Sequence, residues 1–359
     1  MSQNIVIVIG LTPQGLSMLR TLDRGGSHVV AFCMSRHNVG YHSRYGEKVI
    51  FTDAADLKQK VEALIDRIGY RPLCYITSGE LLALVLREYP KLYEHCQVVS
   101  GPYNVIEQLA HKDRMYKIAV DKGFRVAPYK TLDQFRCGDF PFPVFLKRNY
   151  EIPLFFKALR VDNEEDFKAL HKEIHPEQEK DILVQSFIDI SKNDLIEISA
   201  QFFFSQGIAK GGLLTNQKRR LKKGITSYLE ELKQNELTQQ IISICKAFMK
   251  DLYYTGFAEF EFMYDTHTQN LFFIEVNTRT CGLQSSMAHK FSNLYDAIIR
   301  PFDAPELIIR KKQLQWMNIQ RDVRARIEKH DFSHPLDIFR SSFDILDCHD
   351  LRPFFMQFL

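Results

Sequence analysis

The chain has 359 residues, of which 45% are apolar and 28 are phenylalanine, so it can bury a large core divided among two or three domains. Its net charge of +3 is small for this length and argues against a dedicated nucleic-acid binder. The seven cysteines are scattered singly without a C-x-x-C pair, which excludes a disulfide framework and a zinc site of the usual spacing. No apolar run is long enough to span a bilayer, and the N-terminus carries no secretion signal. We therefore expect a cytoplasmic protein with no membrane and no nucleic-acid partner.

The first hundred residues alternate between apolar strands and amphipathic helices. Residues 5–9 form a continuous β-branched run, which is typical of a strand buried on both faces in a parallel sheet. The pattern further predicts strands at 28–33, 48–51 and 73–76, and helices at 14–23 and 56–68. This order indicates a doubly wound α/β domain over residues 1–105. Gly10 and Gly15 do not complete G-x-G-x-x-G, so a dinucleotide site is not expected there.

Two lysines in the next part of the chain are candidates for phosphate binding. Lys112 belongs to H-K-D within a helix predicted over 105–123, and Lys147 closes an apolar strand predicted over 142–147. A lysine in such a place is often only the solvated end of a strand. Two lysines that converge on a polyphosphate would instead supply the point charges that ATP requires. Another apolar run, 183–188, follows and ends in a polar segment, 189–194.

A basic loop, K-R-R-L-K-K at 218–223, is predicted after two antiparallel strands at 196–204 and 208–214. Most charge runs of this kind are simply solvated. Its position before a long helix at 237–252 favours a mobile loop that reaches a phosphate through Lys218 or Arg220. Beyond residue 291 the pattern is helical and charged.

The segment 256–282 is the most informative, because it alternates like two strands joined by a polar loop at 266–270. With that loop, Glu261 lies opposite Glu275, and like charges so placed destabilise a sheet unless a cation lies between them. Carboxylate and amide oxygens, here from Glu261, Glu275 and Asn277, are ligands that magnesium prefers. The alternative is a solvated face of a hairpin, with Arg279 paired to one of its carboxylates.

In this order the motifs resemble the ATP-grasp superfamily, most closely its carboxylate–amine ligases related to D-aspartate ligase and to the carbamoyl-phosphate synthetase large chain. The motifs are G-Y-H-S-R-Y (40–45), H-K-D (111–113), P-V-F-L-K (143–147), L-V-Q-S-F-I (183–188), N-Q-K-R-R (216–220), G-F-A-E-F-E-F (256–262) and F-I-E-V-N-T-R (273–279). The resemblance implies a fold of mixed α/β and α+β class, with a two-subdomain ATP-grasp region after the doubly wound domain. The small subdomain would span 106–182, the large subdomain with the nucleotide and metal site 183–300, and a C-terminal helical extension 301–359.

The resemblance also implies the roles of individual residues. Those that would bind ATP are Lys112, Lys147, Gln185, Ser186, Phe187, Ile188 and Asp194. Asp194 would bind the ribose, and Glu197 is the alternative candidate for that role. Those that would hold one or two Mg²⁺ ions, with Mn²⁺ as an alternative, are Glu261, Glu275 and Asn277. Those with a catalytic role would be Arg279, which anchors the acid substrate, and Lys218 or Arg220, which contacts the γ-phosphate.

One segment departs from the family pattern. Members usually follow the position of Lys147 with a loop rich in glycine and serine, whereas this chain continues R-N-Y-E-I-P-L-F-F-K with no glycine, so its backbone approaches phosphates less closely. The expected activity is ATP-dependent ligation of a small-molecule carboxylate to an amine through an acyl phosphate. The alternatives are activation of bicarbonate or another small acid, and a non-catalytic ATP-binding protein with an altered lid. A homodimer is compatible with the aromatic C-terminal end.

Overall fold

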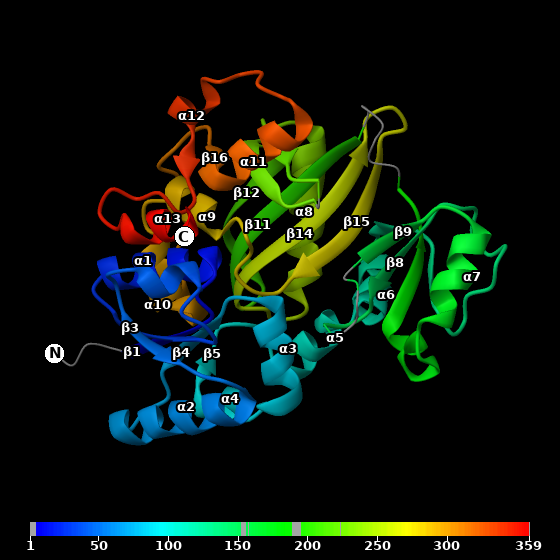
Figure 1. Cartoon of the computed structure of the whole chain (residues 1–359). Coiled ribbons are helices and arrows are strands. Elements are labelled where there is room, and N and C mark those ends of the chain that lie inside the picture. Colours follow the sequence, from blue (N-terminus) through cyan, green and yellow to red (C-terminus); the bar gives the residue numbers. More distant parts are fainter. Residues whose placement is uncertain (1–4, 152–155, 157, 189–194, 223, 359) are drawn as a thin grey trace. The chain divides into compact units, whose positions relative to one another are not determined.

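The computed structural model describes residues 5–151, 156, 158–188, 195–222 and 224–358 (Figure 1). These residues divide into two compact units. The larger unit comprises Met1–Tyr103, Ile198–Phe260 and Asn277–Leu359, and the smaller unit comprises Asn104–Glu197 and Glu261–Val276. No helix of the described residues combines the length and the hydrophobicity that crossing a bilayer requires.

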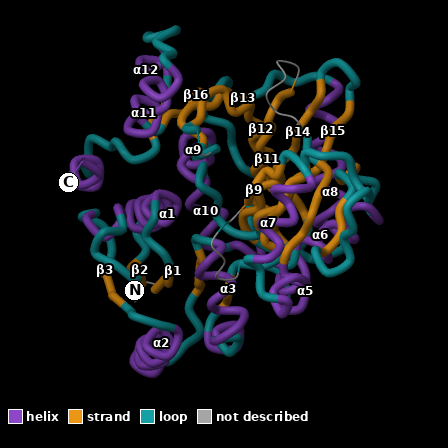
Figure 2. The backbone as a smooth tube through the Cα atoms, turned by 45° about the vertical axis from the view of Figure 1, so that its right-hand side comes forward, coloured by secondary structure: helices purple, strands orange, loops and turns teal. Residues whose placement is uncertain are grey.

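The larger unit begins with a five-stranded parallel sheet. Its strands are β1 (Ile5–Ile9), β2 (His28–Cys33), β3 (Glu47–Ile50), β4 (Leu73–Ile76) and β5 (Gln97–Val98), in the order β3-β2-β1-β4-β5. Val6 to Ile9 are fully buried, as their continuous apolar run predicts. Helices α1 (Pro13–Arg24) and α2 (Ala54–Ile68) lie on opposite faces of this sheet (Figures 1 and 2). The predicted doubly wound arrangement is confirmed.

Helices α3 (Gly79–Glu88) and α4 (Leu92–His95) complete this parallel sheet region. The order of strands reverses between β1 and β4, because β2 and β3 lie on one side of β1 and β4 and β5 on the other. The Ser78 side chain caps α3 by accepting a hydrogen bond from the amide of Leu81. Consequently α3 begins directly at the carboxyl end of β4.

The rest of the larger unit is built on antiparallel strands. They are β11 (Leu195–Ser205), β12 (Ile208–Arg220), β13 (Thr226–Glu231) and β16 (Gln315–Met317), with β17 (Ser342–Phe343) parallel to β16 at one edge and β14 (Gly256–Asp265) after β11. Its helices are α8 (Glu236–Lys250), α9 (Gln284–Lys290), α10 (Leu294–Ile299), α11 (Ile319–Lys329), α12 (Asp337–Arg340) and α13 (Arg352–Phe355). The prediction of a wholly helical C-terminal part is wrong, since β16 and β17 extend the sheet. Their two or three residues are too few to show an alternating pattern.

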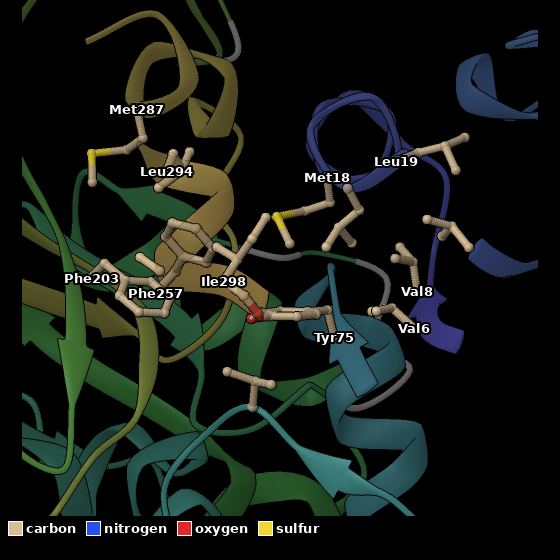
Figure 3. Close-up of a cluster of buried hydrophobic side chains, with 14 of the residues drawn as sticks. Val6, Val8, Met18, Leu19, Tyr75, Phe203, Phe257, Met287, Leu294 and Ile298 are labelled. Carbon is tan, nitrogen blue, oxygen red and sulfur yellow. Dashed lines mark hydrogen bonds between the residues drawn. The ribbon is translucent and has the colours of Figure 1, made fainter. Parts of the chain in front are cut away.

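An apolar core joins the parallel sheet to the antiparallel strands within this unit (Figure 3). Val6 and Val8 of β1 and Met18 of α1 contribute to it, together with Phe203 of β11 and Phe257 of β14. Phe203 and Phe257 pack edge to face, with ring centroids 4.9 Å apart. Burial of this kind stabilises the two sheets as one body, so loops at the carboxyl ends of β1 and β4 have fixed neighbours.

The smaller unit contains a four-stranded antiparallel sheet. Its strands are β7 (Tyr129–Thr131), β8 (Val144–Arg148), β9 (Ala158–Val161) and β10 (Ile182–Ser186), in the order β7-β10-β8-β9. Its helices are α5 (Tyr103–Ala110), α6 (Lys112–Asp121) and α7 (Glu164–Lys172). The part of β14 from Glu261 onward, strand β15 (Asn270–Asn277) without its last residue, and β6 (Arg125–Val126), which pairs with β15, also belong to it.

Two local predictions in this unit require correction. The single helix predicted over 105–123 is two helices, because His111 has an extended backbone and Asn149 accepts hydrogen bonds from the amides of Lys112 and Asp113. The loop of the 256–282 hairpin is one residue shorter than predicted, since Asn270 already belongs to β15. That Glu261 of β14 lies opposite Glu275 of β15 stays a prediction.

Candidate functional site

Lys147 in the smaller unit is a buried cation. It lies near the end of β8 with only 7% of its surface exposed, so it is not a solvated strand end. Its Nζ donates a hydrogen bond to the hydroxyl of Tyr116 and lies 4.9 Å from the centre of that ring. The Tyr116 hydroxyl in turn donates to the carbonyl of Ile274, at 2.8 Å. The lysine is thus held by a chain of two hydrogen bonds that reaches β15.

Burial lowers the pKa of Lys147, the nearby positive charge of Lys112 acts in the same direction, and the resulting pKa is about 7. The carboxylates of Glu275 and Glu261 act in the opposite direction and raise this pKa. Burial next to Glu275 and Glu261 also raises the pKa of the Tyr116 phenol. Two cations and two carboxylates therefore share one electrostatic environment, and a strongly shifted lysine of this type is common at functional sites.

Lys112 and Glu275 form an ion pair in the smaller unit. Each side chain is 26% exposed, so the pair is partly shielded from water. Lys112 is the first residue of α6, and Asn149 fixes this helix start through its carbonyl and its side-chain oxygen. Asn149 is itself buried and follows Arg148 at the end of β8. The end of β8 therefore positions both lysines that the sequence indicated.

An apolar slot of about 100 Å³ lies next to Lys147 in the smaller unit. Four of its lining residues are 185–188, the segment predicted to bind ATP. The full lining is Phe145, Lys147, Gln185, Ser186, Phe187, Ile188, Met263 and Ile274. The Gln185 amide is buried and donates to the carbonyl of Ala127 at 3.0 Å, which holds segment 185–188 against β7. A small apolar slot with a few polar groups in its lining is the type of place that accepts a small-molecule ring.

The slot contains residues that the sequence reasoning did not identify. Phe145 pairs with Gln185 across β8 and β10, while Met263 and Ile274 come from β14 and β15. Tyr116 and Asn149 were also missed. Phe145 lies two residues before Lys147 on β8 and shares its face, which is the signal that could have identified it, but no local pattern shows which strand would face it.

In the larger unit, Glu259 contacts Asn277. Glu259 is 6% exposed, accepts a hydrogen bond from the Ser199 hydroxyl at 2.6 Å and lies 3.3 Å from the Asn277 amide nitrogen. Arg279 donates to the Asn277 side-chain oxygen and to the carbonyl of Thr280, both at 3.0 Å. Glu259 precedes Glu261 by two residues and shares its face of β14, which is the signal that could have identified it.

Arg279 lies at the carboxyl end of β4. A Cβ placed on Gly79 would lie 3.3 Å from both Nε and Nη2 of Arg279, so the guanidinium packs directly on the first residue of α3. This is the point at which the order of strands reverses, between β1 and β4. In open α/β sheets, ligands bind in the crevice outside the carboxyl ends of strands at such a point.

The basic segment 218–223 is not simply a loop. Lys218 and Arg220 lie in β12, because the strand continues to Arg220 and pairs with β13 through two irregularities. Between them, Arg219 pairs with Asp322 and Asp337, both at 2.8 Å. Lys218 is exposed and Arg220 is half-buried, both within the larger unit.

Some of the predicted positions cannot be placed. Asp194 lies outside the described residues, as do residues 152–155 and 157 of the segment that follows Lys147. Glu197 is described and lies in β11.

No known family model matches the sequence, and no curated protein is significantly similar to it. The structure, in contrast, is similar to solved ones. An ADP complex of N5-carboxyaminoimidazole ribonucleotide synthetase superposes with a TM-score of 0.71 at 14% identity, over 89% of this chain and 84% of that one. The L-amino acid ligase of Bacillus licheniformis gives 0.63 at 14% identity, over 85% and 75% of the two chains.

A third similar structure is the dimeric biotin carboxylase domain of 2-oxoglutarate carboxylase from Hydrogenobacter thermophilus, in complex with MgADP, ADP and bicarbonate. It superposes with a TM-score of 0.63 at 16% identity, over 83% of this chain and 69% of that one. The chain therefore has the ATP-grasp fold, and the resemblance carried by its motifs is confirmed at the level of the fold.

Proposed function

We propose that the chain is an ATP-dependent ligase that joins a carboxylate to an amine through an acyl phosphate. The observation that carries this proposal is the arrangement in the smaller unit, where the buried Lys147 and the Lys112–Glu275 ion pair lie beside the slot formed by residues 185–188. The shared fold supports it, because structures with this fold bind ADP or MgADP. Neither the fold nor the slot identifies the acid or the amine.

The smaller unit has the groups that a nucleoside triphosphate needs. The slot would accept the base between its apolar walls, with residues 185–188 in its lining. Lys147 and Lys112 supply positive charge for the phosphates, and Lys147 gains its full charge when an anion arrives, since its pKa in the free protein is about 7.

Carboxylates in this unit are of the kind that magnesium prefers, and Glu261 and Glu275 would hold the ion as hard oxygen ligands. The ligand role of Asn277, the last residue of β15, stays a prediction. The ion would arrive with ATP and neutralise phosphate charge. Glu275 now pairs with Lys112, so Lys112 must turn from this carboxylate to the phosphates when Glu275 accepts a metal.

The chemistry requires no nucleophilic side chain. A carboxylate oxygen of the substrate attacks the γ-phosphorus of ATP, which forms the acyl phosphate and releases ADP. The amine nitrogen then attacks the acyl carbon, phosphate leaves, and the amine loses a proton to give the amide. Arg279 on Gly79 is the group that we assign to the acid carboxylate, because its planar fork matches two oxygens. Lys218 and Arg220 stay predictions as γ-phosphate contacts.

A trapping assay tests the proposal. The protein is incubated with ATP, magnesium and a panel of amino and hydroxy acids, with hydroxylamine in place of the amine, and both ADP and hydroxamate are measured. Hydroxamate with one acid supports the ligase. ADP release with bicarbonate only would favour activation of that acid instead. A thermal shift with ATP but no ADP formation would favour a non-catalytic binder, the alternative suggested by the glycine-free segment after Lys147.

A further inference from the structure

The surface formed by α11 and the segment after it is unusually apolar. Six large apolar side chains on it are 36% to 84% exposed. The two aromatic ones, Phe339 and Phe332, are 84% and 67% exposed. The six are Val323, Ile327, Phe332, Leu336, Ile338 and Phe339, which we call the C-terminal apolar surface. Soluble monomers rarely leave such a patch uncovered, and those that do usually bind something with it.

This surface is firmly held by buried ion pairs. Asp322 of α11 pairs with Arg219 of β12 and with Arg326, each at 2.8 Å, and Asp337 pairs with Arg219 at the same distance. Arg326 also donates to the backbone carbonyls of Ser333 and His334. The segment from 331 to 340 is therefore tied to α11 and β12 on its inner side, while its apolar side chains point outward. Pre-ordering of this kind lowers the entropic cost of binding.

A hollow and a projection lie on the same surface. A cavity of about 240 Å³ has a mostly apolar lining, which also includes the ion pair of Asp322 and Arg326. Its apolar lining residues are Met317, Ile319, Val323, Phe332, Pro335 and Ile338. Phe339 follows Ile338 and projects almost fully into solvent. A surface that carries both an apolar hollow and an aromatic projection is complementary to itself across a two-fold axis. Aromatic side chains that fill pockets are the usual strong contacts of protein interfaces.

We propose that the C-terminal apolar surface binds a second copy of this chain, with Phe339 of each copy inserted into the hollow of the other. The six side chains expose on the order of 500 Å² of apolar area. A stable interface buries about 800 Å² on each partner, of which about 65% is apolar in homodimers, so the apolar area matches what a dimer needs.

The charges around the surface fit this occupant. Arg324, Lys329 and Arg340 are exposed basic residues on the same segment, and Glu328 and Asp331 are half-buried acidic ones. A two-fold axis places residue i of one copy against residue j of the other, so opposite charges can pair across the rim.

Sedimentation velocity of the full chain from nanomolar to tens of micromolar concentration tests the proposal. The wild type is expected to form a dimer. Phe339→Ser removes the projection and should weaken dimerisation about thirtyfold or more. Val323→Phe fills the hollow at a half-exposed position and should have a similar effect. Tyr253→Ser, at an aromatic residue 72% exposed in the turn after α8, is the matched control and should leave the dimer unchanged.

Circular dichroism and thermal unfolding of each variant show that the fold persists, which is expected because all three side chains are at least half exposed. A wild type that stays monomeric at every concentration overturns the proposal, as does a dimer that both patch variants leave intact. Vesicles of phosphatidylglycerol and of phosphatidylcholine complete the test. Binding of a monomeric wild type to either, lost in Phe339→Ser, would make a lipid surface the occupant and would equally overturn it.

Discussion

The ammonium of Lys147 donates to the hydroxyl of Tyr116, and no acidic side chain in the described part of the chain forms an ion pair with it. The neighbouring carboxylate of Glu275 is taken by Lys112. A buried lysine whose partner is a neutral hydroxyl is costly to keep charged. This cost makes Lys147 a group whose charge responds to what binds near it.

Replacement of Lys147 by an uncharged side chain should raise the stability of the fold and weaken ATP binding. In the free protein the pKa of Lys147 falls from 10.5 to about 7, which disfavours its charged form by several kcal/mol. Lys147→Met keeps the length of the side chain and removes the charge, so we expect the free energy of unfolding at pH 7 to rise by about 2 kcal/mol. ATP affinity should fall at least about tenfold. Urea unfolding and calorimetric titration measure the two effects, with Lys168→Met on the exposed face of α7 as control. A destabilised variant that still binds ATP would contradict this account.

ATP binding should depend on pH in a defined direction. The folded pKa lies below the unfolded one, so the unfolded chain binds the extra proton between pH 7 and 10.5 and stability from this group rises across that window. Phosphates favour the charged lysine, so binding takes up a proton above pH 7 and affinity should fall, by up to about tenfold for each pH unit, between pH 7.5 and 9. Calorimetry in buffers of different ionisation enthalpy counts the proton. An uptake that persists in Lys147→Met would exclude this residue as its source.

Glu275→Gln tests the metal assignment. The substitution removes one anionic oxygen and the ion pair with Lys112 while it keeps the shape of the side chain. ADP formation with magnesium should fall about 100-fold, whereas ATP binding measured without metal should be unchanged or tighter because Lys112 is released. Glu164→Gln, at a surface partner of Lys168 in the same unit, is the control. Turnover close to wild type would remove Glu275 from the metal set.

A single methyl group on Gly79 should affect the acid and not the nucleotide. A Cβ there would lie 3.3 Å from Nε and Nη2 of Arg279, so the guanidinium must move by a few tenths of an ångström. Gly79→Ala is expected to raise the KM for the acid about threefold to tenfold without a change in the KM for ATP. Stability should be equal or slightly higher, since alanine favours the start of α3. Gly282→Ala, where a Cβ would meet nothing within 4 Å, is the matched control.

Glu259 and Glu261 can be distinguished by the same substitution. Glu259→Gln disturbs hydrogen bonds to Ser199 and Asn277, so the Asn277 amide loses its fixed orientation. We expect thermal stability to fall, by about 1–3 kcal/mol, because a buried group loses a charge-assisted partner. Glu261→Gln should change stability little and lower magnesium-dependent ADP formation. If Glu259→Gln instead lowered magnesium-dependent ADP formation and Glu261→Gln lowered stability, Glu259 would be the ligand and the sequence-based choice of Glu261 would be wrong.

The chain's local patterns predicted most of its elements. The β-branched run of β1 and the alternation of β14 and β15 are period signals carried by neighbouring residues, and these elements lie where the patterns indicated. The basic segment 218–223 was predicted as a loop, but β12 continues to Arg220. Its own residues do not show this, because the strand is extended by pairing with β13. The break at His111 was missed for a similar reason, since Asn149, 38 positions away, supplies the hydrogen bonds that start α6.

The sequence by itself determined which side chains could serve a nucleotide site, because residue type sets chemistry and strand alternation sets the face. Lys112, Lys147 and Glu275 were singled out this way, whereas the role of residues 185–188 was implied by the resemblance to ATP-grasp ligases. Only the tertiary structure decided what each of them meets. It paired Glu275 with Lys112, Lys147 with Tyr116 and Arg279 with Gly79, all contacts between positions far apart in the chain. Such contacts depend on the packing of whole sheets and helices, for which no local spacing carries a signal.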